Sequence, residues 1–268
     1  MLKLYDHPLS PYAQKVKLAL LEKNIPFETS LPTNLGSGEA NPEFSHASPR
    51  AEVPALIDDD FPIFDSTIIL EYIEDKWPTP SLMPATPQDR ARVRMIEDAM
   101  DTHYEAINWG LAELAYFGRA SGGLLDEINA AAAAQISRWH GWLGAQLDES
   151  SWFNGETFGW GDICVAPYLN GSAGFNLLPP AGSKLADWLG RVNQRESVRK
   201  VSEAAANMAM GNNPAGMDAV RELLEKGLFK REYRDHRLEW MIKSGGISIV
   251  IDGLAKDNIR FTREFETV

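Results

Sequence analysis

The chain has 268 residues, which is enough for one large domain or two smaller ones. Apolar residues make up 44% of it, as is usual for a protein with a buried core, and 38 acidic residues against 26 basic ones give a net charge of −12. This charge argues against nonspecific binding to nucleic acids or anionic membranes, because contacts with phosphates need a positive surface.

The first part of the chain alternates strand and helix patterns. LKLY near the N-terminus predicts a strand, and the amphipathic stretch after Ser10 predicts a helix. NIPFETSL predicts a second strand, and the polar stretch 32–51 predicts a loop with a short, irregular helix. Two apolar segments, Ala55–Ile57 and Pro62–Phe64, flank an acidic turn and predict a hairpin. STIILEYIEDKW predicts a further helix, so the order fits a four-stranded mixed sheet with helices packed on it.

The second part of the chain reads as helical. Four prolines between Pro78 and Gln88 mark a linker or a domain boundary. Beyond them, helical patterns follow one another without a strand signal, which predicts an all-α domain. These patterns cover residues 88–114, 126–147, 160–170, 184–194 and 196–209.

A third piece begins after the breaker MGNNPAG. It is charged, but it also carries Phe229, Tyr233, Trp240 and Phe261. A disordered tail would rarely carry so many large apolar groups. We therefore expect the segment from Met217 onward to be ordered and to cover part of a cleft or fold onto the helical domain.

The sequence shows no residue pattern typical of a disulfide-bonded, metal-binding or membrane-spanning protein. Cys164 is the single cysteine, so an internal disulfide is excluded. The five histidines show no ligand spacing, which predicts no metal site. No apolar run is long enough to cross a bilayer, and no secretory leader pattern is visible, so we expect a cytoplasmic protein.

Ser10 stands where the loop after the first strand enters a helix. Backbone N–H groups at such a helix N-terminus point toward something negative. Redox proteins of this architecture carry Cys-x-x-Cys here, whereas this chain has Ser10 and Ala13, so sulfur chemistry would need a borrowed thiol. The alternative is that Ser10 only caps the helix, with Pro11 in its first position.

Three motifs of the first part occur in an order and at a spacing that resemble a known family. They are SPYAQKV from Ser10, SPRAEVPAL from Ser48 and FDSTIILEYIED from Phe64. With the linker and the helical second part, they make the chain similar to the cytosolic glutathione transferases, as a bacterial-like, serine-type member with a long C-terminal extension. The resemblance covers roughly the first ~210 residues.

The resemblance implies a fold and a division into domains. It implies an α/β thioredoxin-like N-terminal domain followed by an all-α helical domain, the glutathione transferase fold. The ranges expected are a glutathione-binding domain 1–79, a linker 80–87, a helical substrate domain 88–211 and a helical extension 212–268.

The resemblance also implies how glutathione is held. The Val53–Pro54 bond is expected to be cis, so that the backbone of Val53 pairs with the cysteinyl residue; an ordinary trans bond at a strand start is the alternative. Asp65 and Ser66 would hold the γ-glutamyl end at a helix N-terminus, or would merely cap that helix. The implied glutathione-binding set is Ser10, Glu52, Val53, Pro54, Asp65 and Ser66.

The expected role of Ser10 is to donate a hydrogen bond to the glutathione sulfur. A free thiol titrates near ~8.5, so a donor beside a helix N-terminus favours the thiolate at neutral pH. Tyr5 and Tyr12 are the competing hydroxyls for this catalytic role.

The helical domain is expected to hold the second substrate. The resemblance implies that Tyr104, Asn108 and Trp109, together with Tyr12, line a site for an apolar electrophile. Packing in the core or at a dimer interface is the alternative for each aromatic residue. Asp162 resembles the acid of the family's helix-capping motif, with Gly159 in the place of Ser or Thr, and Cys164 is expected to be buried.

These observations predict a glutathione S-transferase that stabilises the glutathione thiolate for attack on an apolar electrophile, acting in detoxification with no metal. A glutathione-dependent ether-cleaving, dehalogenating or isomerising enzyme is an alternative, as is a noncatalytic glutathione-binding, ligand-binding or regulatory protein. A homodimer is expected. Charged residues of the first long helix are candidates for its interface, although a solvated helix face is the plainer interpretation. They are Arg90, Arg92, Arg94, Glu97, Asp98 and Asp101.

Overall fold

A computed structural model describes residues 1–32, 35, 42–211 and 214–262. These residues form two compact units, and each is described by itself. The first unit comprises Met1–Pro80, Ala204–Arg234 and Val250–Val268, and the second comprises Ser81–Glu203 and Asp235–Ile249. The first change of unit falls after Pro80, inside the proline-rich segment.

The first unit contains the predicted sheet in the order β2-β1-β3-β4. Strand β1 runs parallel to β2 and antiparallel to β3, and β3 and β4 form the predicted hairpin. The elements are β1 (Leu2–Tyr5), α1 (Pro11–Glu22), β2 (Phe27–Ser30), α2 (Pro42–Ala47), β3 (Ala55–Asp58), β4 (Phe61–Phe64) and α3 (Ser66–Lys76). Residues 33–34 and 36–41 of the predicted loop lie outside the described residues.

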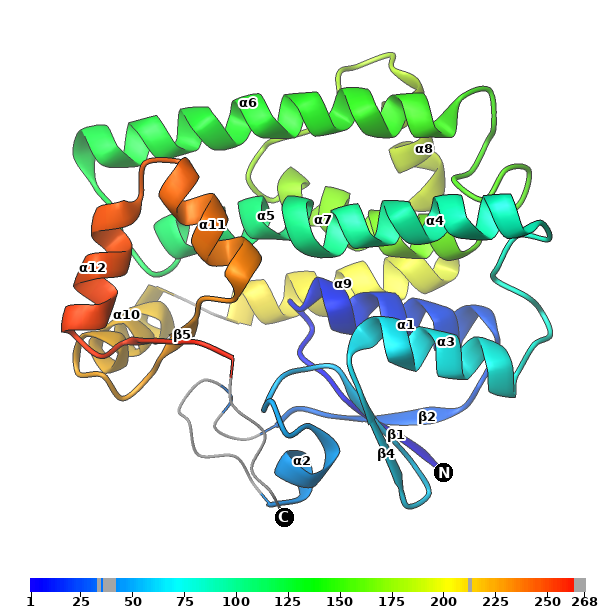
Figure 1. Cartoon of the computed structure of the whole chain (residues 1–268), viewed down its shortest axis with the longest axis horizontal. Helices are drawn as coiled ribbons and strands as arrows, with labels where there is room; N and C mark the ends of the chain where they lie inside the picture. Colours follow the sequence, from blue (N-terminus) through cyan, green and yellow to red (C-terminus); the bar gives the residue numbers. More distant parts are fainter. Residues whose placement is uncertain (33–34, 36–41, 212–213, 263–268) are drawn as a thin grey trace. The chain divides into compact units, whose positions relative to one another are not determined.

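Helices cover both faces of this sheet (Figure 1). Helices α1 and α3 lie on one face, and the short α2 lies on the other. Since side chains of a strand alternate between faces, Leu2 and Leu4 of β1 are buried on one side, while Tyr5 packs against Phe44 of α2 on the other. These side chains, buried on the two faces of the sheet, keep the strands in fixed register.

The second unit is helical, as predicted. Helices α4 and α5 are joined by a π-helical turn, η1. The long helix predicted for residues 88–114 is therefore continuous, with a local change of backbone hydrogen bonding at η1. The elements are α4 (Pro87–Ala99), η1 (Met100–Tyr104), α5 (Glu105–Ala115), α6 (Gly122–Leu147), α7 (Trp160–Ala173), α8 (Lys184–Val192) and the start of α9 (Glu196–Gly211).

Two charged residues named as candidates for a dimer interface make contacts inside this unit. The guanidinium of Arg92 donates to backbone carbonyls of Gln146 and Phe153. Glu97 is buried and accepts a hydrogen bond from the indole of Trp160 at 2.6 Å. Helical periodicity shows which residues share a face but not what that face meets.

Asp162 fixes the start of α7, as expected. Its carboxylate accepts from the backbone N–H of Gly159 and Phe153 and from the indole of Trp188. Burial raises the pKa of Asp162 to about 6 against these bonds. Gly159 replaces Ser or Thr for a steric reason, because a Cβ there would lie 2.4 Å from the carbonyl oxygen of Leu82. Cys164 is buried, as predicted.

The extension is ordered over residues 214–262, as predicted, and it is not purely helical. It consists of α10 (Pro214–Glu225), β5 (Arg231–Glu232), α11 (Asp235–Lys243), α12 (Ile247–Ala255) and β6 (Ile259–Arg260). Strands β5 and β6 pair in parallel within the first unit, whereas α11 packs against α5 in the second. The expectation that the extension folds onto the helical domain therefore holds for Asp235–Ile249, which comprises α11 and the start of α12.

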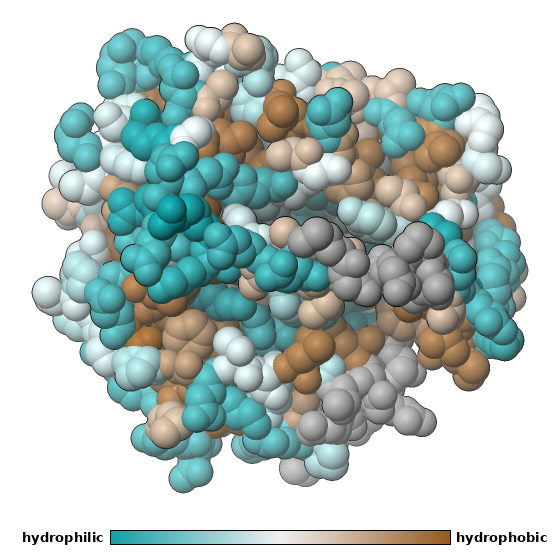
Figure 2. Space-filling view, turned by 180° about the vertical axis from the view of Figure 1, so that it is seen from behind, coloured by the Kyte–Doolittle hydropathy of each residue, from teal (hydrophilic) through white to brown (hydrophobic). Residues whose placement is uncertain are grey.

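Two further properties concern the described part of the chain as a whole. None of its helices is both long enough and apolar enough to cross a membrane. On the face shown in Figure 2, hydrophilic and hydrophobic side chains are interspersed.

Candidate functional site

The sheet register brings the three sequence motifs to one edge. Tyr5 of β1 pairs with Ala55 of β3, and Ala55 pairs with Phe64 of β4. Because β1 and β4 end at this row while β3 starts there, the loop to Ser10, the Val53–Pro54 segment and Asp65 all follow or precede the same row. The register therefore groups the residues that the sequence places far apart.

Ser10 is the N-cap of α1. Its Oγ accepts a hydrogen bond from the N–H of Ala13 at 3.3 Å, and Pro11 occupies the first helical position. Its own N–H donates to the carbonyl of His7 at 2.8 Å. Capping uses a lone pair of the hydroxyl, so its hydrogen can still be donated to a ligand at the helix N-terminus.

The Val53–Pro54 peptide bond is cis, as predicted. The residue before it, Glu52, donates its backbone N–H to the Oγ of Ser48 at 3.1 Å. This bond holds the loop that leads into β3.

Asp65 caps α3 and has a φ of 75°. Its Oδ1 accepts from the N–H groups of Thr67 at 3.0 Å and Ile68 at 3.4 Å, while Ser66 is buried as the first helical residue. Of the two capping residues considered, Asp65 is therefore the cap. Arg50 lies 4.0 Å from the Asp65 carboxylate and 5.4 Å from the ring of Phe64, and nothing in the sequence pattern had marked it.

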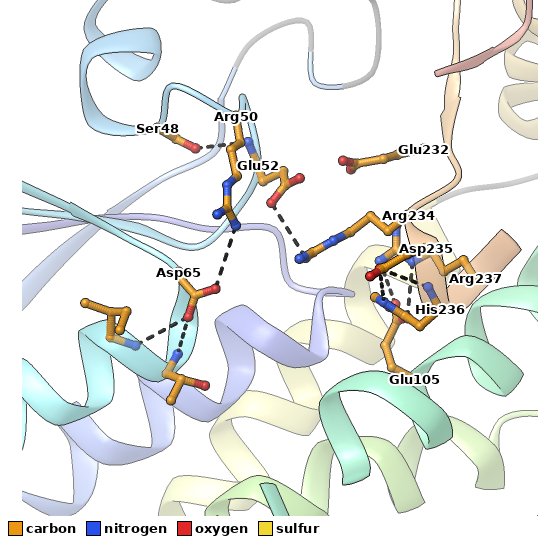
Figure 3. A network of polar contacts seen from close by, with 12 residues as sticks. Ser48, Arg50, Glu52, Asp65, Glu105, Glu232, Arg234, Asp235, His236 and Arg237 are labelled. Carbon is orange, nitrogen blue, oxygen red and sulfur yellow. Dashed lines mark hydrogen bonds and ion pairs between the residues drawn. The ribbon is translucent and has the colours of Figure 1, made fainter. Parts of the chain in front are cut away.

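The extension contributes charged residues to the same edge, and the sequence analysis missed them. Arg234 forms an ion pair with Glu52 at 3.7 Å (Figure 3). Burial raises the pKa of Glu52, and the neighbouring carboxyl of Glu232 raises it further by hydrogen bonding and by charge. No local signal could have found this contact, since it joins segments at opposite ends of the chain.

The two tyrosines proposed as competitors of Ser10 differ in position. Tyr5 is 1% exposed and belongs to the core cluster with Phe44, Ala47 and Ala55, on the α2 side of the sheet. Burial raises the pKa of its hydroxyl. Tyr12 lies in the first turn of α1, half-buried.

Comparisons with known proteins agree with this arrangement. Residues 4–81 match the family described as glutathione S-transferase, N-terminal domain. Glutathione S-transferase 2 of Saccharomyces cerevisiae is 30% identical over 216 residues, which cover 75% of this chain and 89% of that protein. The chain belongs to the glutathione S-transferase family.

Other relatives in this family carry different names. A stringent starvation protein A homolog of Haemophilus ducreyi is 26% identical, over 74% of this chain and 87% of that protein. Maleylacetoacetate isomerase of Rattus norvegicus is 42% identical over 98 residues, which cover 35% of this chain and 45% of the isomerase.

A solved structure supports the fold. The glutathione S-transferase from Rhodospirillum rubrum F11 superposes with a TM-score of 0.63 at 27% identity, over 75% of this chain and 91% of that one. The thioredoxin-like domain followed by a helical domain is therefore the glutathione S-transferase fold.

Two of the residues expected to contact substrate lie inside the helical unit, which corrects that expectation. Tyr104 is fully buried, and its hydroxyl oxygen lies 2.9 Å from Oγ of Ser172 and 3.2 Å from Nε2 of His140. Burial raises its pKa. The amide of Asn108 donates to the carbonyl of Tyr168 at 2.8 Å and accepts from Ser172 at 2.8 Å. Tyr104 of η1 and Asn108 of α5 thus contact α7 through Ser172.

Trp109, the third of these residues, is covered by the extension. It is 8% exposed, and the guanidinium of Arg237 on α11 lies 5.3 Å from its ring centre. Helix α11 thus occupies the face of α5 that carries Trp109. A substrate site on this face would have to include residues of α11.

Metal chemistry has no evident site in the described part of the chain. Its histidine, cysteine and acidic side chains form no group of three that could hold a metal ion.

Proposed function

We propose that this family member is a glutathione-dependent transferase in which Ser10 stabilises the glutathione thiolate for attack on an apolar electrophile. The observation that carries the proposal is the convergence of Ser10, the cis Val53–Pro54 segment and Asp65 at one edge of the sheet.

In this proposal the cysteinyl residue and the γ-glutamyl end of glutathione bind to different segments of the first unit. The backbone of Val53 pairs with the cysteinyl residue, and Asp65 with Ser66 and the N-terminus of α3 takes the γ-glutamyl end. The sulfur then lies at the N-terminus of α1, where the Ser10 hydroxyl and the helix dipole favour its charged form. Rate enhancement comes from holding and ionising the thiol, not from a covalent enzyme intermediate.

The placement of Tyr5 favours Ser10 over this tyrosine. Tyr5 packs on the α2 face of the sheet, whereas Ser10 begins α1, which covers the opposite face. Tyr12 remains a competitor because it shares the first turn of α1 with the serine.

Replacement of Ser10 tests the proposal. Ser10→Ala should leave the glutathione Kd nearly unchanged, because the proposed contacts of glutathione with Val53 and Asp65 remain. The thiolate absorbance of bound glutathione at neutral pH should fall, and kcat with an activated aryl halide should drop on the order of ten- to a hundredfold for one charged hydrogen bond. Tyr12→Phe is the matched control. Full activity in Ser10→Ala with loss in Tyr12→Phe would move the role to the tyrosine.

Isomerisation is the second candidate, and the similarity to maleylacetoacetate isomerase favours it. The same thiolate would add to a conjugated double bond and leave again after rotation, so glutathione is not consumed. Conversion of a cis-enone acid at constant glutathione concentration would support this reaction over transfer. If bound glutathione shows no thiolate at neutral pH, both enzymes are ruled out in favour of a noncatalytic binding protein.

A further inference from the structure

The turn between β1 and α1 sets the position of Ser10. It runs from His7 to Ser10, with Pro8 and Leu9 as its central residues. The N–H of Ser10 donates to the carbonyl of His7 at 2.8 Å, which closes the turn, and proline is favoured in the first central position. Because Ser10 is both the last residue of the turn and the N-cap of α1, a change in the turn moves its hydroxyl.

The imidazole of His7 closes the same turn a second time. The N–H of Leu9 donates to its Nδ1 at 3.2 Å. Asn and Asp side chains close turns in this way, by accepting a hydrogen bond from the backbone two residues further along. An accepting Nδ1 carries no hydrogen, so the neutral ring carries its proton on Nε2. His7 therefore does for Leu9 what an asparagine would do.

Two further contacts tie the turn to α1. Asp6, just before the turn, is buried and pairs with Lys17 at 2.8 Å. The amide of Gln14 donates to the carbonyl of Pro8 at 2.7 Å. The bond from Leu9 differs from these contacts because it requires a neutral imidazole, since a protonated ring carries a hydrogen on both nitrogens and cannot accept.

The surroundings of His7 favour the neutral ring. Burial lowers the pKa of the imidazole, the charge of Asp6 opposes this, and the charge of Arg231 adds to it. Asp6 precedes the turn and pairs with Lys17, and Arg231 belongs to β5 of the extension. Among the described residues, Asp6 and Arg231 are the charged groups that act on this ring. The imidazole is therefore able to accept from Leu9 at neutral pH.

We propose that His7 is a positioning residue, whose neutral imidazole holds the turn through the N–H of Leu9 and so fixes the Ser10 hydroxyl where the glutathione sulfur binds. This inference rests on the proposed function and names the residue that sets the geometry of Ser10. His7 acts through the serine and not on the substrate. Protonation of the ring breaks the bond from Leu9, so the alignment of Ser10 is lost as the pH falls through the pKa of His7.

Two replacements separate the acceptor from the ring. His7→Asn keeps an acceptor for the N–H of Leu9, whereas His7→Phe keeps a ring without an acceptor. His7→Phe should raise the thiol pKa of bound glutathione, followed by thiolate absorbance, and should lower kcat with an activated aryl halide on the order of tenfold, because a small displacement of a catalytic group is costly. The glutathione Kd should stay nearly unchanged. His7→Asn should keep all three values, and equal effects of the two replacements would overturn the inference.

A double replacement tests whether His7 acts through Ser10. In a Ser10→Ala background, His7→Phe should cause no further loss of kcat, because the hydroxyl that it positions is already absent. A further loss as large as in the unaltered background would overturn the inference. A thiolate signal that Ser10→Ala reduces and His7→Phe does not would overturn the inference alone, whereas no thiolate in the unaltered protein would overturn the proposed function too.

The pH profile provides a readout that a merely structural role would not change. The thiol titrates in the unaltered protein and in His7→Asn, so the ratio of their kcat values isolates the imidazole. This ratio should fall as the pH is lowered from about 7.5 to about 5, because only the unaltered protein then loses its acceptor. A constant ratio would overturn the inference. Since this comparison does not need His7→Phe, it holds even where that variant fails to fold.

Discussion

At the scale of single residues, Glu52 has the least ordinary environment in the site. Burial raises its pKa to about 8, the hydrogen bond and charge of Glu232 add to this, and Arg234 and Arg50 oppose it. An ionised carboxylate next to a bound anionic peptide would repel it. A retained proton removes this repulsion.

Glutathione binding is therefore expected to depend on pH through Glu52. S-methylglutathione is the suitable probe because its sulfur cannot ionise. Since the proton is held below pH about 8 and lost above it, affinity should fall as the pH rises through this value. Glu52→Gln imitates the protonated form, so it should keep the low-pH affinity across the range. Parallel pH profiles of the two proteins, measured by calorimetry, would contradict this role of Glu52.

Ser10 provides a second prediction at this scale. Ser10→Cys places a thiol at the N-terminus of α1, where the helix dipole lowers a thiol pKa. The variant should form a mixed disulfide with oxidised glutathione, seen by mass spectrometry as one added glutathionyl group. Cys164 is buried, so the unaltered protein should remain unmodified under the same conditions and serves as the control. Modification of both proteins to the same extent would show that the N-terminus of α1 is not the reactive position.

At the scale of elements, α11 is anchored to α5 by a buried ion pair. Glu105 accepts hydrogen bonds from the guanidinium of Arg237 at 2.6 and 3.1 Å and lies 3.1 Å from Nε2 of His236. Burial alone would raise the pKa of Glu105, but Arg237 and His236 lower it to about 2. The pair also carries Arg237 over Trp109.

Removal of this carboxylate should destabilise the second unit. Glu105→Gln leaves Arg237 buried without its counter-charge, which costs about 3–5 kcal/mol of unfolding free energy. In the unaltered protein, this contribution is present above pH 4.5 and is lost as the pH falls toward about 2, because the folded state binds the proton less tightly than the unfolded state. Urea unfolding measures both effects. Glu239→Gln removes an exposed partner of Lys243 on the same helix and should change little.

The close approach of α11 to α5 requires a glycine. A Cβ on Gly110 would lie 1.9 Å from the ring of Trp240, whose indole donates to Gln135 at 2.9 Å. Gly110→Ala should therefore displace α11 and shift the fluorescence of Trp240 toward that of an exposed indole. Gly141→Ala in α6 meets nothing within 4 Å and should be neutral or stabilising by up to about 1 kcal/mol, because alanine favours helices. An unchanged spectrum in Gly110→Ala would disprove the contact.

At the scale of the whole molecule, the extension belongs to both units. Residues up to Arg234 and from Val250 cluster with the first unit, and the residues between them cluster with the second. Residues 214–262 thus complete both units and are not an appendage of either.

We propose that the chain forms a homodimer, as its resemblance to the family implies. Sedimentation at micromolar concentration should show a species of about twice the monomer mass, which is 29.8 kDa. Arg92 and Glu97 also make contacts within the chain. A single monomeric species would contradict the proposal.

The sequence by itself determined the elements and the ends of the site. Alternation and capping residues are local signals, and they correctly predicted the hairpin and the helix that Ser10 caps, whereas the cis bond was implied by the resemblance to the family. The grouping of the three motifs was implied by the resemblance to the family, and the strand register brings them to one edge of the sheet.

Only the tertiary structure decided which side chains face outward and which distant segments meet. Helical spacing put Tyr104 and Trp109 on the same long helix, but it could not show that α7 buries the first and α11 covers the second. The pairing of Arg234 with Glu52 likewise has no local signature. Packing across the chain depends on complementary surfaces of remote elements, and these are complete only once the chain has folded.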